Sequence, residues 1–522
     1  MVGVLIRVEK SERLTAICLL LASVAFHACS IDQQSLFVDE VAEINAAHGT
    51  WQATIWRADS MPPLYPIALK SWIGLFGTDA AGRWMSVGCS VLAAISAWQY
   101  SRIWFGPTIG LWVLLLMLLN PLNIFYGQWT RAYALMLLWA TVSIGAFAAG
   151  CNRGRKLDWV VFLAATVLGI YTHYYFVMMT FSLFVGWLLQ RQYGRWKPVL
   201  LSLAAAGLLC LPIVVFLQED FEYQKAIRQP RPLSLSALAY TYLSLFSGFA
   251  IGPSQGELHA LSLEQSVRQV ALPGIVLMLA SVPLLLRGLH KLRRVGWMPT
   301  WICLLVLPLS LIGVLGALSG ITYNVRFVCW LTMPLSICIA LGIAATESRQ
   351  WHRADAGDSN KLLPSTGYRK WQLICGALTI VFMMIALCNR MQIEKYQFED
   401  IRAAAGYLRE QGSPAESVFV VSDYMVEPLR YYLNEFMPAI ELPTRGVWSV
   451  VFKNEETVRQ AVESLRENAA GRYWLLYSRE YHGDPSSLLL SELKNHHQLI
   501  EVKQFAGVKL YSGKVTQSAQ AR

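Results

Sequence analysis

Residues 298–346 read MPTWICLLVLPLSLIGVLGALSGITYNVRFVCWLTMPLSICIALGIAAT, and Arg326 is the single charged residue among them. A run of about 20 apolar residues is long enough to cross the hydrocarbon core of a bilayer as a helix. The stretch therefore predicts two membrane-spanning helices, at 299–318 and 328–346. The short connection between them carries Arg326.

Similar apolar stretches occur along most of the chain, which is 55% hydrophobic and only 15% charged. A helix satisfies its own backbone hydrogen bonds, so it is the structure that such stretches adopt in lipid. We therefore expect a polytopic α-helical membrane protein with about 11 transmembrane helices. They are expected at 14–31, 80–100, 107–124, 132–150, 158–172, 174–190, 199–217, 270–286, 299–318, 328–346 and 371–389.

A further apolar segment, LSLSALAYTYLSLFSGFAI at 233–251, raises the alternative of a twelfth span. A twelfth span would place the basic cluster RGLHKLRR, at 287–294, on the outer side of the membrane. Lys and Arg concentrate instead in cytoplasmic loops. We expect the segment to be interfacial or re-entrant, within a long outer loop.

The net charge of +10 follows from the membrane topology and does not call for a nucleic-acid partner. Basic residues are concentrated in alternate short loops, beginning with Arg7, Lys10 and Arg13 before the first span. This pattern predicts a cytoplasmic N-terminus and an extracytoplasmic C-terminal domain, in the inner (plasma) membrane of a bacterium. Residues 1–30 could alternatively form a signal peptide, but AFHACS at 25–30 is a poor cleavage context.

All ten cysteines lie between Cys18 and Cys388, in or beside apolar stretches, and no CxxC pair occurs. This distribution argues against a disulfide-stapled domain and against a zinc site. We expect the cysteines to be small buried apolar residues.

The composition changes after Asn389, which predicts two domains, a transmembrane module at 1–390 and an extracytoplasmic α/β domain at 391–522. Short apolar runs predict strands at 418–422, 472–478 and 507–513. Amphipathic stretches predict helices at 403–412, 427–436 and 455–471.

Two arginines stand at the outer ends of predicted spans, Arg131 in YGQWTRAYAL and Arg326 in TYNVRFVCW. Each could simply snorkel to the membrane surface beside an aromatic residue. Together, and flanked by Tyr133 and Tyr323, they suggest an anion at the outer leaflet, because a guanidinium binds phosphate with two hydrogen bonds. His173, in the outer hairpin YTHYYF, would donate to the same anion, or else is an aromatic-belt residue with a satisfied imidazole.

Two acids, Asp39 and Glu40 in SLFVDEVAEI (35–44), follow the first span almost at once. If a helix runs to Gly49, Asp39 is a candidate N-cap and Glu40 favours the helix dipole. Capping does not explain why Asp39 and Glu43 share one helix face, where like charges repel.

The same outer loop continues as WRADSMPPLYP, residues 56–66, and adds Arg57, Asp59 and a Pro62–Pro63 break. Acids and arginines that are distant in the sequence are thus expected on one side of the membrane.

Six motifs in this order resemble the membrane glycosyltransferases of the C superfamily (GT-C). They are FVDE (37–40), DSMPPLYP (59–66), NPLNIFYGQWTRAYAL (120–135), LGIYTHYYF (168–176), YNVRF (323–327) and KYQFEDIRAAAGYL (395–408). The closest branch is the family 39-like group, which includes protein O-mannosyltransferases and lipid A aminoarabinose transferases. The resemblance covers roughly residues 10–410 and is carried by the shared order of short motifs.

The resemblance implies transfer of a sugar from a polyprenyl-phosphate donor to an acceptor outside the cytoplasm. It also implies that Asp39 is the catalytic carboxylate. Relatives commonly have a histidine before the double proline, where this chain has Met61, so no ligand role is expected at that position.

Glycosyl transfer from a sugar phosphodiester to a hydroxyl requires few catalytic groups. Transfer at an anomeric carbon has an oxocarbenium-like transition state, and an inverting displacement needs one base. Asp39 is expected to be that base, with Glu40 tuning it, orienting it or capping the helix. Phosphate leaves well, so a basic clamp replaces the second carboxylic acid of a hydrolase. The residues expected to bind the donor phosphate or sugar are Arg131, Tyr133, Arg326, His173, Arg57, Asp59 and Lys70.

Two other functions are alternatives for this sequence. A lipid-linked glycan ligase or polymerase would use arginines and a histidine of a large outer loop, and the loop at 218–269 contains Arg228, Arg231, His259 and Arg268. A polytopic transporter would place ionisable residues near mid-membrane, often in two matching halves. The predicted spans are nearly free of charge and show no internal repeat, which disfavours the transporter.

No cofactor is established by the sequence, and no spacing of metal ligands is evident, although a divalent cation between Asp39 and a phosphate fits the same chemistry. The expected partners are the polyprenyl-phosphate-sugar donor, an acceptor with a lipid, glycan or protein hydroxyl, and the lipid bilayer.

Overall fold

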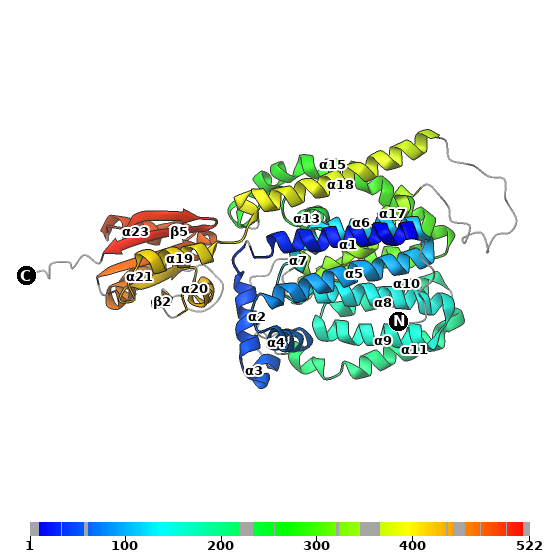
Figure 1. Ribbon diagram of the computed structural model, residues 1–522, viewed down its shortest axis with the longest axis horizontal. Coiled ribbons are helices and arrows are strands. Elements are labelled where there is room, and N and C mark those ends of the chain that lie inside the picture. The colour runs from blue at the N-terminus through cyan, green and yellow to red at the C-terminus, as the bar shows by residue number, and fades with distance from the viewer. Residues whose placement is uncertain are drawn as a thin grey trace, which may run out of the picture.

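The computed structural model describes residues 10–32, 34–56, 61–191, 193–218, 233–254, 256–319, 323–344, 366–434, 437–441, 455–469, 471–496 and 498–514. A bundle of long helices forms one part of the molecule, and a small α/β domain lies at one end of it (Figure 1). Short helices between the two parts carry the candidate site.

Every one of the eleven predicted spans overlaps a helix. The helices that overlap these spans are α1 (Lys10–Ser30), α5 (Ala81–Phe105), α6 (Pro107–Leu119), α8 (Tyr133–Arg153), α9 (Lys156–Thr172), α10 (Phe176–Gln190), α11 (Trp196–Leu209), α15 (Leu263–Arg294), α16 (Met298–Ser319), α17 (Thr332–Ile343) and α18 (Thr366–Gln392). The other helices described in this part are α2 (Val38–His48), α3 (Trp51–Ile55), α4 (Leu64–Phe76), α7 (Pro121–Gly127), α13 (Leu235–Ser247) and α14 (Glu257–Ala260), with 3₁₀ helices η1 (Tyr193–Arg195), η2 (Val325–Leu331) and η4 (Glu394–Tyr396).

Six helical stretches among the described residues are long and apolar enough to cross a membrane, namely α1, α8, α15, α16, η2 with α17, and α18. The bent pair α6–α7 makes a seventh if it forms one span. The apolar helices α4, α10, α11 and α13 are shorter. The chain is therefore a mostly helical protein with several apolar helices, and the count of eleven spans stays a prediction.

The predicted span at 107–124 is broken in the middle, where α6 and α7 meet at 57°. The Asn120 side chain accepts hydrogen bonds from the backbone N–H groups of Leu122 (3.0 Å) and Asn123 (3.1 Å), so it caps α7. Pro121 occupies the first turn, where its missing N–H costs nothing. The second helix of the bent pair, α7, ends at Gly127, and residues 128–132, including Arg131, form a non-helical connection to α8.

The C-terminal part is a five-stranded sheet in the order β2-β1-β3-β5-β4. Its strands are β1 (Ser417–Val421), β2 (Ala439–Glu441), β3 (Arg472–Ser478), β4 (Ile500–Phe505) and β5 (Val508–Lys514). The strand β1 is parallel to β2 and β3, whereas β5 is antiparallel to β3 and β4. Within the parallel pair, Val418 is in register with Trp474.

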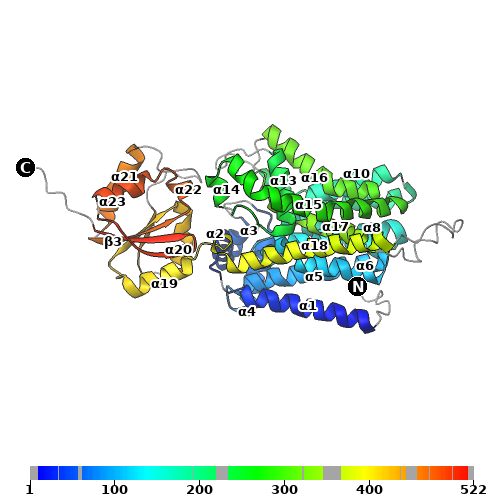
Figure 2. The same cartoon turned by 90° about the horizontal axis from the view of Figure 1, so that it is seen from above.

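Helices cover both faces of this sheet (Figure 2). One apolar core joins it to α19 (Ile401–Gln411) and α20 (Val426–Leu433), and another joins it to α21 (Glu455–Asn468) and α23 (Leu488–His496). The remaining elements are α22 (Glu480–Gly483) and η5 (Asp423–Met425). The three predicted strands and three predicted helices are all present. The strands β2 and β4 were not predicted, because β2 has three residues and the sequence of β4, IEVKQF, lacks a buried face.

Glycines hold α15 against α17, the helix that follows Arg326. A methyl group added to Gly288 of α15 would overlap the carbonyl oxygen of Cys338, and one added to Gly342 of α17 would overlap that of Leu284. Small residues allow such close backbone approach between membrane helices.

We expect Gly342→Leu to lower the free energy of unfolding by about 1–3 kcal/mol, the usual cost of overpacking, because the two backbones must separate. Gly274→Leu, on α15 itself, is the matched control, because a Cβ there meets nothing within 4 Å. Thermal unfolding of both purified variants in detergent measures the difference. Equal stability of the two would contradict this packing.

Candidate functional site

A short connection joins the end of α1 to α2, and the first turn of α2 contains both acids of the FVDE motif. The residue at the N-cap position is Phe37, and the Glu40 carboxylate accepts the Phe37 backbone N–H at 2.9 Å. The alternative that Asp39 is the N-cap is therefore wrong. Glu40 makes the capping bond, and the Asp39 side chain is directed to other partners.

Asp39 lies between two guanidinium groups from distant parts of the chain. Its Oδ2 atom is 3.7 Å from Nη2 of Arg131 and 3.6 Å from Nη1 of Arg326. The Asp39 side chain is 19% exposed, so it is reachable from outside. At these distances the contacts are ion pairs rather than short hydrogen bonds. The structure thus brings together the predicted acid and both predicted arginines.

Arg131 also bonds Glu43, with Nη1 at 2.7 Å from Oε1. Glu43 is buried, one helical turn after Asp39 on the same face of α2. The repulsion expected between these two carboxylates is relieved because one guanidinium lies between them. The same contacts fix the position of Arg131.

His173 and Tyr133 pack next to the arginines. The His173 ring centroid is 5.9 Å from those of Tyr133 and Phe327, the residue after Arg326. Burial, reinforced by the charges of Arg326 and Arg131, lowers the pKa of His173 to about 3, so its ring is neutral near pH 7. Its Nδ1 atom accepts the Tyr175 N–H at 3.3 Å, which leaves the ring proton on Nε2. His173 can therefore donate one hydrogen bond but adds no positive charge.

A small pocket opens beside Arg131. The double-proline motif forms one wall, and acidic, basic and aromatic side chains form the rest. Its lining residues are Glu43, Met61, Pro62, Tyr65, Pro66, Arg131, Ala132, Tyr133 and Thr172.

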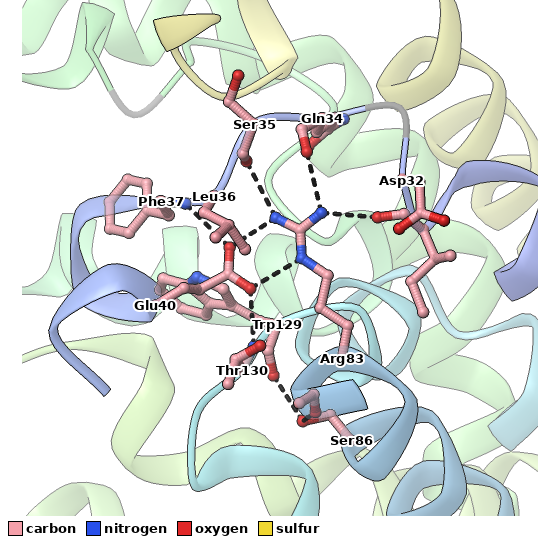
Figure 3. A network of polar contacts seen from close by, with 12 residues as sticks. Asp32, Gln34, Ser35, Leu36, Phe37, Glu40, Arg83, Ser86, Trp129 and Thr130 are labelled. Atoms are coloured by element: carbon pink, nitrogen blue, oxygen red, sulfur yellow. Dashed lines mark hydrogen bonds and ion pairs between the residues drawn. The ribbon is translucent and has the colours of Figure 1, made fainter. Parts of the chain in front are cut away.

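Glu40 lies in a polar network with Arg83 and Thr130 (Figure 3). Its fully buried carboxylate forms a two-point ion pair with Arg83 of α5, with Nε 2.9 Å from Oε1 and Nη2 2.7 Å from Oε2. Its Oε1 atom also accepts the backbone N–H of Thr130 at 2.9 Å. This geometry favours the capping alternative. The catalytic role suggested for Glu40 stays a prediction.

Lys70 of α4 is not part of the cluster. Its Nζ donates to the carbonyl oxygens of Ala47 (2.7 Å) and Gly49, and lies 5.1 Å from the centre of a Trp51 ring. These carbonyls are at the C-terminal end of α2, where a cation stabilises the helix dipole. Asp39 is near the opposite end of this 11-residue helix, roughly 12–15 Å from these carbonyls along the axis at 1.5 Å per residue. The structure therefore separates Lys70 from the predicted phosphate clamp.

The predicted site residues Arg57 and Asp59 lie outside the described residues. Arg83 was missed, although an arginine inside a predicted span is a recognisable signal.

Among the described residues, no three His, Cys, Asp or Glu side chains are grouped to hold a metal ion. A divalent cation beside Asp39 therefore stays a prediction.

No protein-family model matches the chain, and no curated protein matches its sequence. Solved structures do match. ArnT from Cupriavidus metallidurans in the apo state gives a TM-score of 0.58 at 12% identity, over 95% of this chain and 97% of ArnT. The same protein bound to undecaprenyl phosphate gives 0.55 at 12% identity with the same coverage.

A second protein also matches. An Archaeoglobus fulgidus oligosaccharyltransferase tethered to an acceptor peptide gives a TM-score of 0.53 at 12% identity, over 90% of this chain and 69% of that one. ArnT, a lipid A aminoarabinose transferase, and this oligosaccharyltransferase are both members of the GT-C superfamily. At such low identity the likeness concerns the fold.

We expect Glu40→Gln to cost about 3–5 kcal/mol of stability, because it leaves the Arg83 guanidinium buried without its counter-charge. Glu427→Gln is the control, since Glu427 pairs with Arg430 on the surface, where such a pair contributes about 1 kcal/mol or less. Thermal unfolding in detergent compares the two. A Glu40→Gln protein as stable as the control would show that the pair does not hold α2 in place.

Proposed function

We propose that this chain, which has the fold of the GT-C glycosyltransferases, is an inverting glycosyltransferase. It moves a sugar from a polyprenyl-phosphate donor to a hydroxyl of an extracytoplasmic lipid, glycan or protein. The observation that carries the proposal is the position of one partly exposed carboxylate, Asp39, between Arg131 and Arg326.

Asp39 acts as the general base in this reaction. It accepts the proton of the acceptor hydroxyl as the oxygen attacks the anomeric carbon, and its negative charge stabilises the developing oxocarbenium ion. The bond from the anomeric carbon to the phosphate oxygen breaks on the opposite face, so the anomeric configuration inverts. The polyprenyl phosphate leaves as an anion and needs no second carboxylic acid.

Arg131 and Arg326 bind the phosphate. Nε of Arg326 is buried and has no hydrogen-bond partner among the described residues. A buried donor without a partner is costly, and a phosphate oxygen would satisfy it. The neutral His173, with its proton on Nε2, is the further donor of this clamp, and Tyr133 packs beside it.

The lipid tail of the donor lies among the apolar helices. The fold neighbour ArnT has been solved with undecaprenyl phosphate, which supports a donor of this class. Eleven spans would place the transmembrane module, 1–390, with its N-terminus in the cytoplasm of a bacterium. The α/β domain, 391–522, would then face outwards, on the side of the candidate site.

The described arginine of the loop at 218–269 does not support the alternative of a glycan ligase or polymerase. Arg228 and Arg231 lie outside the described residues. Arg268 is exposed and pairs with Glu264 one turn away on α15, as ordinary surface residues do. No geometric observation favours a transporter.

We expect Asp39→Asn to lower kcat by about 10²–10⁴, the usual contribution of a general base, while the protein still inserts and folds. The assay uses purified protein in nanodiscs with polyprenyl-phosphate sugars and detects the glycosylated acceptor by mass spectrometry. The control is Glu427→Gln, which removes an exposed carboxylate of the soluble domain. Normal turnover by Asp39→Asn would exclude the proposed mechanism.

We expect Arg326→Gln to raise the KM for the donor about 10- to 100-fold, because a charge-assisted hydrogen bond to phosphate contributes about 1.5–3 kcal/mol. Arg430→Gln, a surface arginine paired with Glu427, should leave KM unchanged. An unchanged donor KM in Arg326→Gln would remove Arg326 from the phosphate site.

A further inference from the structure

The connection between α1 and α2 consists of residues 31–37, of which all but residue 33 are described, and we call it the strap. It forms no helix or strand, and it ends two residues before Asp39. Backbone groups of such a segment need partners from elsewhere. The partners of the strap come from both parts of the molecule.

In the transmembrane module, Arg83 binds backbone carbonyl groups of the strap. Nη1 of this arginine donates to the carbonyl oxygens of Ile31 (2.6 Å) and Gln34 (3.0 Å), and Nη2 donates to that of Ser35 (3.0 Å). Figure 3 shows the Arg83 guanidinium enclosed by strap carbonyls on one side and by Glu40 on the other.

The C-terminal domain holds the same segment from its other side through α19. Nη1 and Nη2 of Arg402 donate to the carbonyl oxygens of Asp32 and Gln34, each at 2.8 Å. The hydroxyl of Ser35 donates to Asp400 at 2.8 Å and accepts the backbone N–H of Arg402 at 3.0 Å. The Gln34 carbonyl is thus bonded by Arg83 and Arg402 together.

The end of the strap is held by three further contacts from this domain. The Leu36 backbone N–H donates to the Tyr432 hydroxyl of α20 at 2.7 Å. The Phe37 ring lies 5.0 Å from that of Phe398 and 4.6 Å from the Arg479 guanidinium. Each residue from 34 to 37 therefore contacts the C-terminal domain immediately before α2 begins.

These contacts bear on the reaction because the two arginines beside Asp39 belong to other segments of the chain. Arg131 lies between α7 and α8 and Arg326 lies in η2, whereas Asp39 is in the first turn of α2, directly after the strap. A displacement of about 1 Å at a reacting group can cost about 10²-fold in rate.

We propose that the C-terminal domain positions the Asp39 carboxylate, and that Tyr432, Arg402 and Asp400 are positioning residues that act through the strap. The effect on turnover rests on the proposed function. The mechanical part, that the domain orders residues 34–40, does not depend on the function.

The test compares Tyr432→Phe with Tyr431→Phe in the full-length protein. Both remove one hydroxyl from α20 at the same interface. The Tyr432 hydroxyl accepts from the strap, whereas the Tyr431 hydroxyl donates to Asp79 at 2.7 Å, at the turn between α4 and α5. A general weakening of the interface would affect both variants alike.

We expect Tyr432→Phe to lower kcat about 10-fold, with the donor KM within twofold of wild type, and to speed amide hydrogen exchange in residues 34–40. Tyr431→Phe should keep kcat within twofold and leave exchange of the strap unchanged. Equal losses in both variants would overturn the proposal, as would unchanged exchange in Tyr432→Phe or faster exchange without a change in kcat. If the wild type transfers no sugar from any polyprenyl-phosphate donor, the proposed function fails, while the exchange measurement still decides whether the domain holds the strap.

Discussion

The arrangement of the site depends on the buried ion pair between Glu40 and Arg83. Through its two carboxylate oxygens Glu40 caps α2, pairs with Arg83 and accepts the N–H of Thr130. The helix that carries Asp39 and the connection that carries Arg131 are thereby fixed to one side chain. Removing two charges from water is expensive, and only the complete set of hydrogen bonds offsets that cost. The pair thus permits one arrangement of these segments.

The positions of charged residues relative to the apolar stretches were the most informative feature of the sequence. Apolar runs predicted the helices. The energetic cost of charges near lipid drew attention to Asp39, Arg131 and Arg326, and in the structure a guanidinium nitrogen of each arginine lies within 4 Å of the Asp39 Oδ2 atom. The division of roles between neighbouring acids could not be predicted, because Asp39 and Glu40 differ only in which side of α2 they face. The position of Lys70 could not be predicted either, because its ammonium group binds carbonyls at the far end of that helix, and a cation at a helix end leaves no trace in residue spacing.

The break at Asn120 and Pro121 shows how local backbone chemistry shapes the site. A continuous helix through 130 would have buried Arg131 in a regular turn among apolar neighbours. The asparagine cap and the proline start the separate helix α7, which ends at Gly127, and Arg131 lies in the short connection after it, where it reaches both Asp39 and Glu43. The double proline at 62–63 similarly precedes α4, and its first member, Pro62, lines the pocket beside Arg131.

The carbonyl of Gln34 is shared between a guanidinium encoded early in the chain and one encoded more than 300 residues later. Ribosomes make the chain from its N-terminus, so Arg83 can engage this peptide group long before Arg402 exists. The segment that leads into Asp39 would then gain its second set of contacts only when the C-terminal domain has been synthesised and has folded, so a nascent chain that lacks this domain would hold the segment from one side alone.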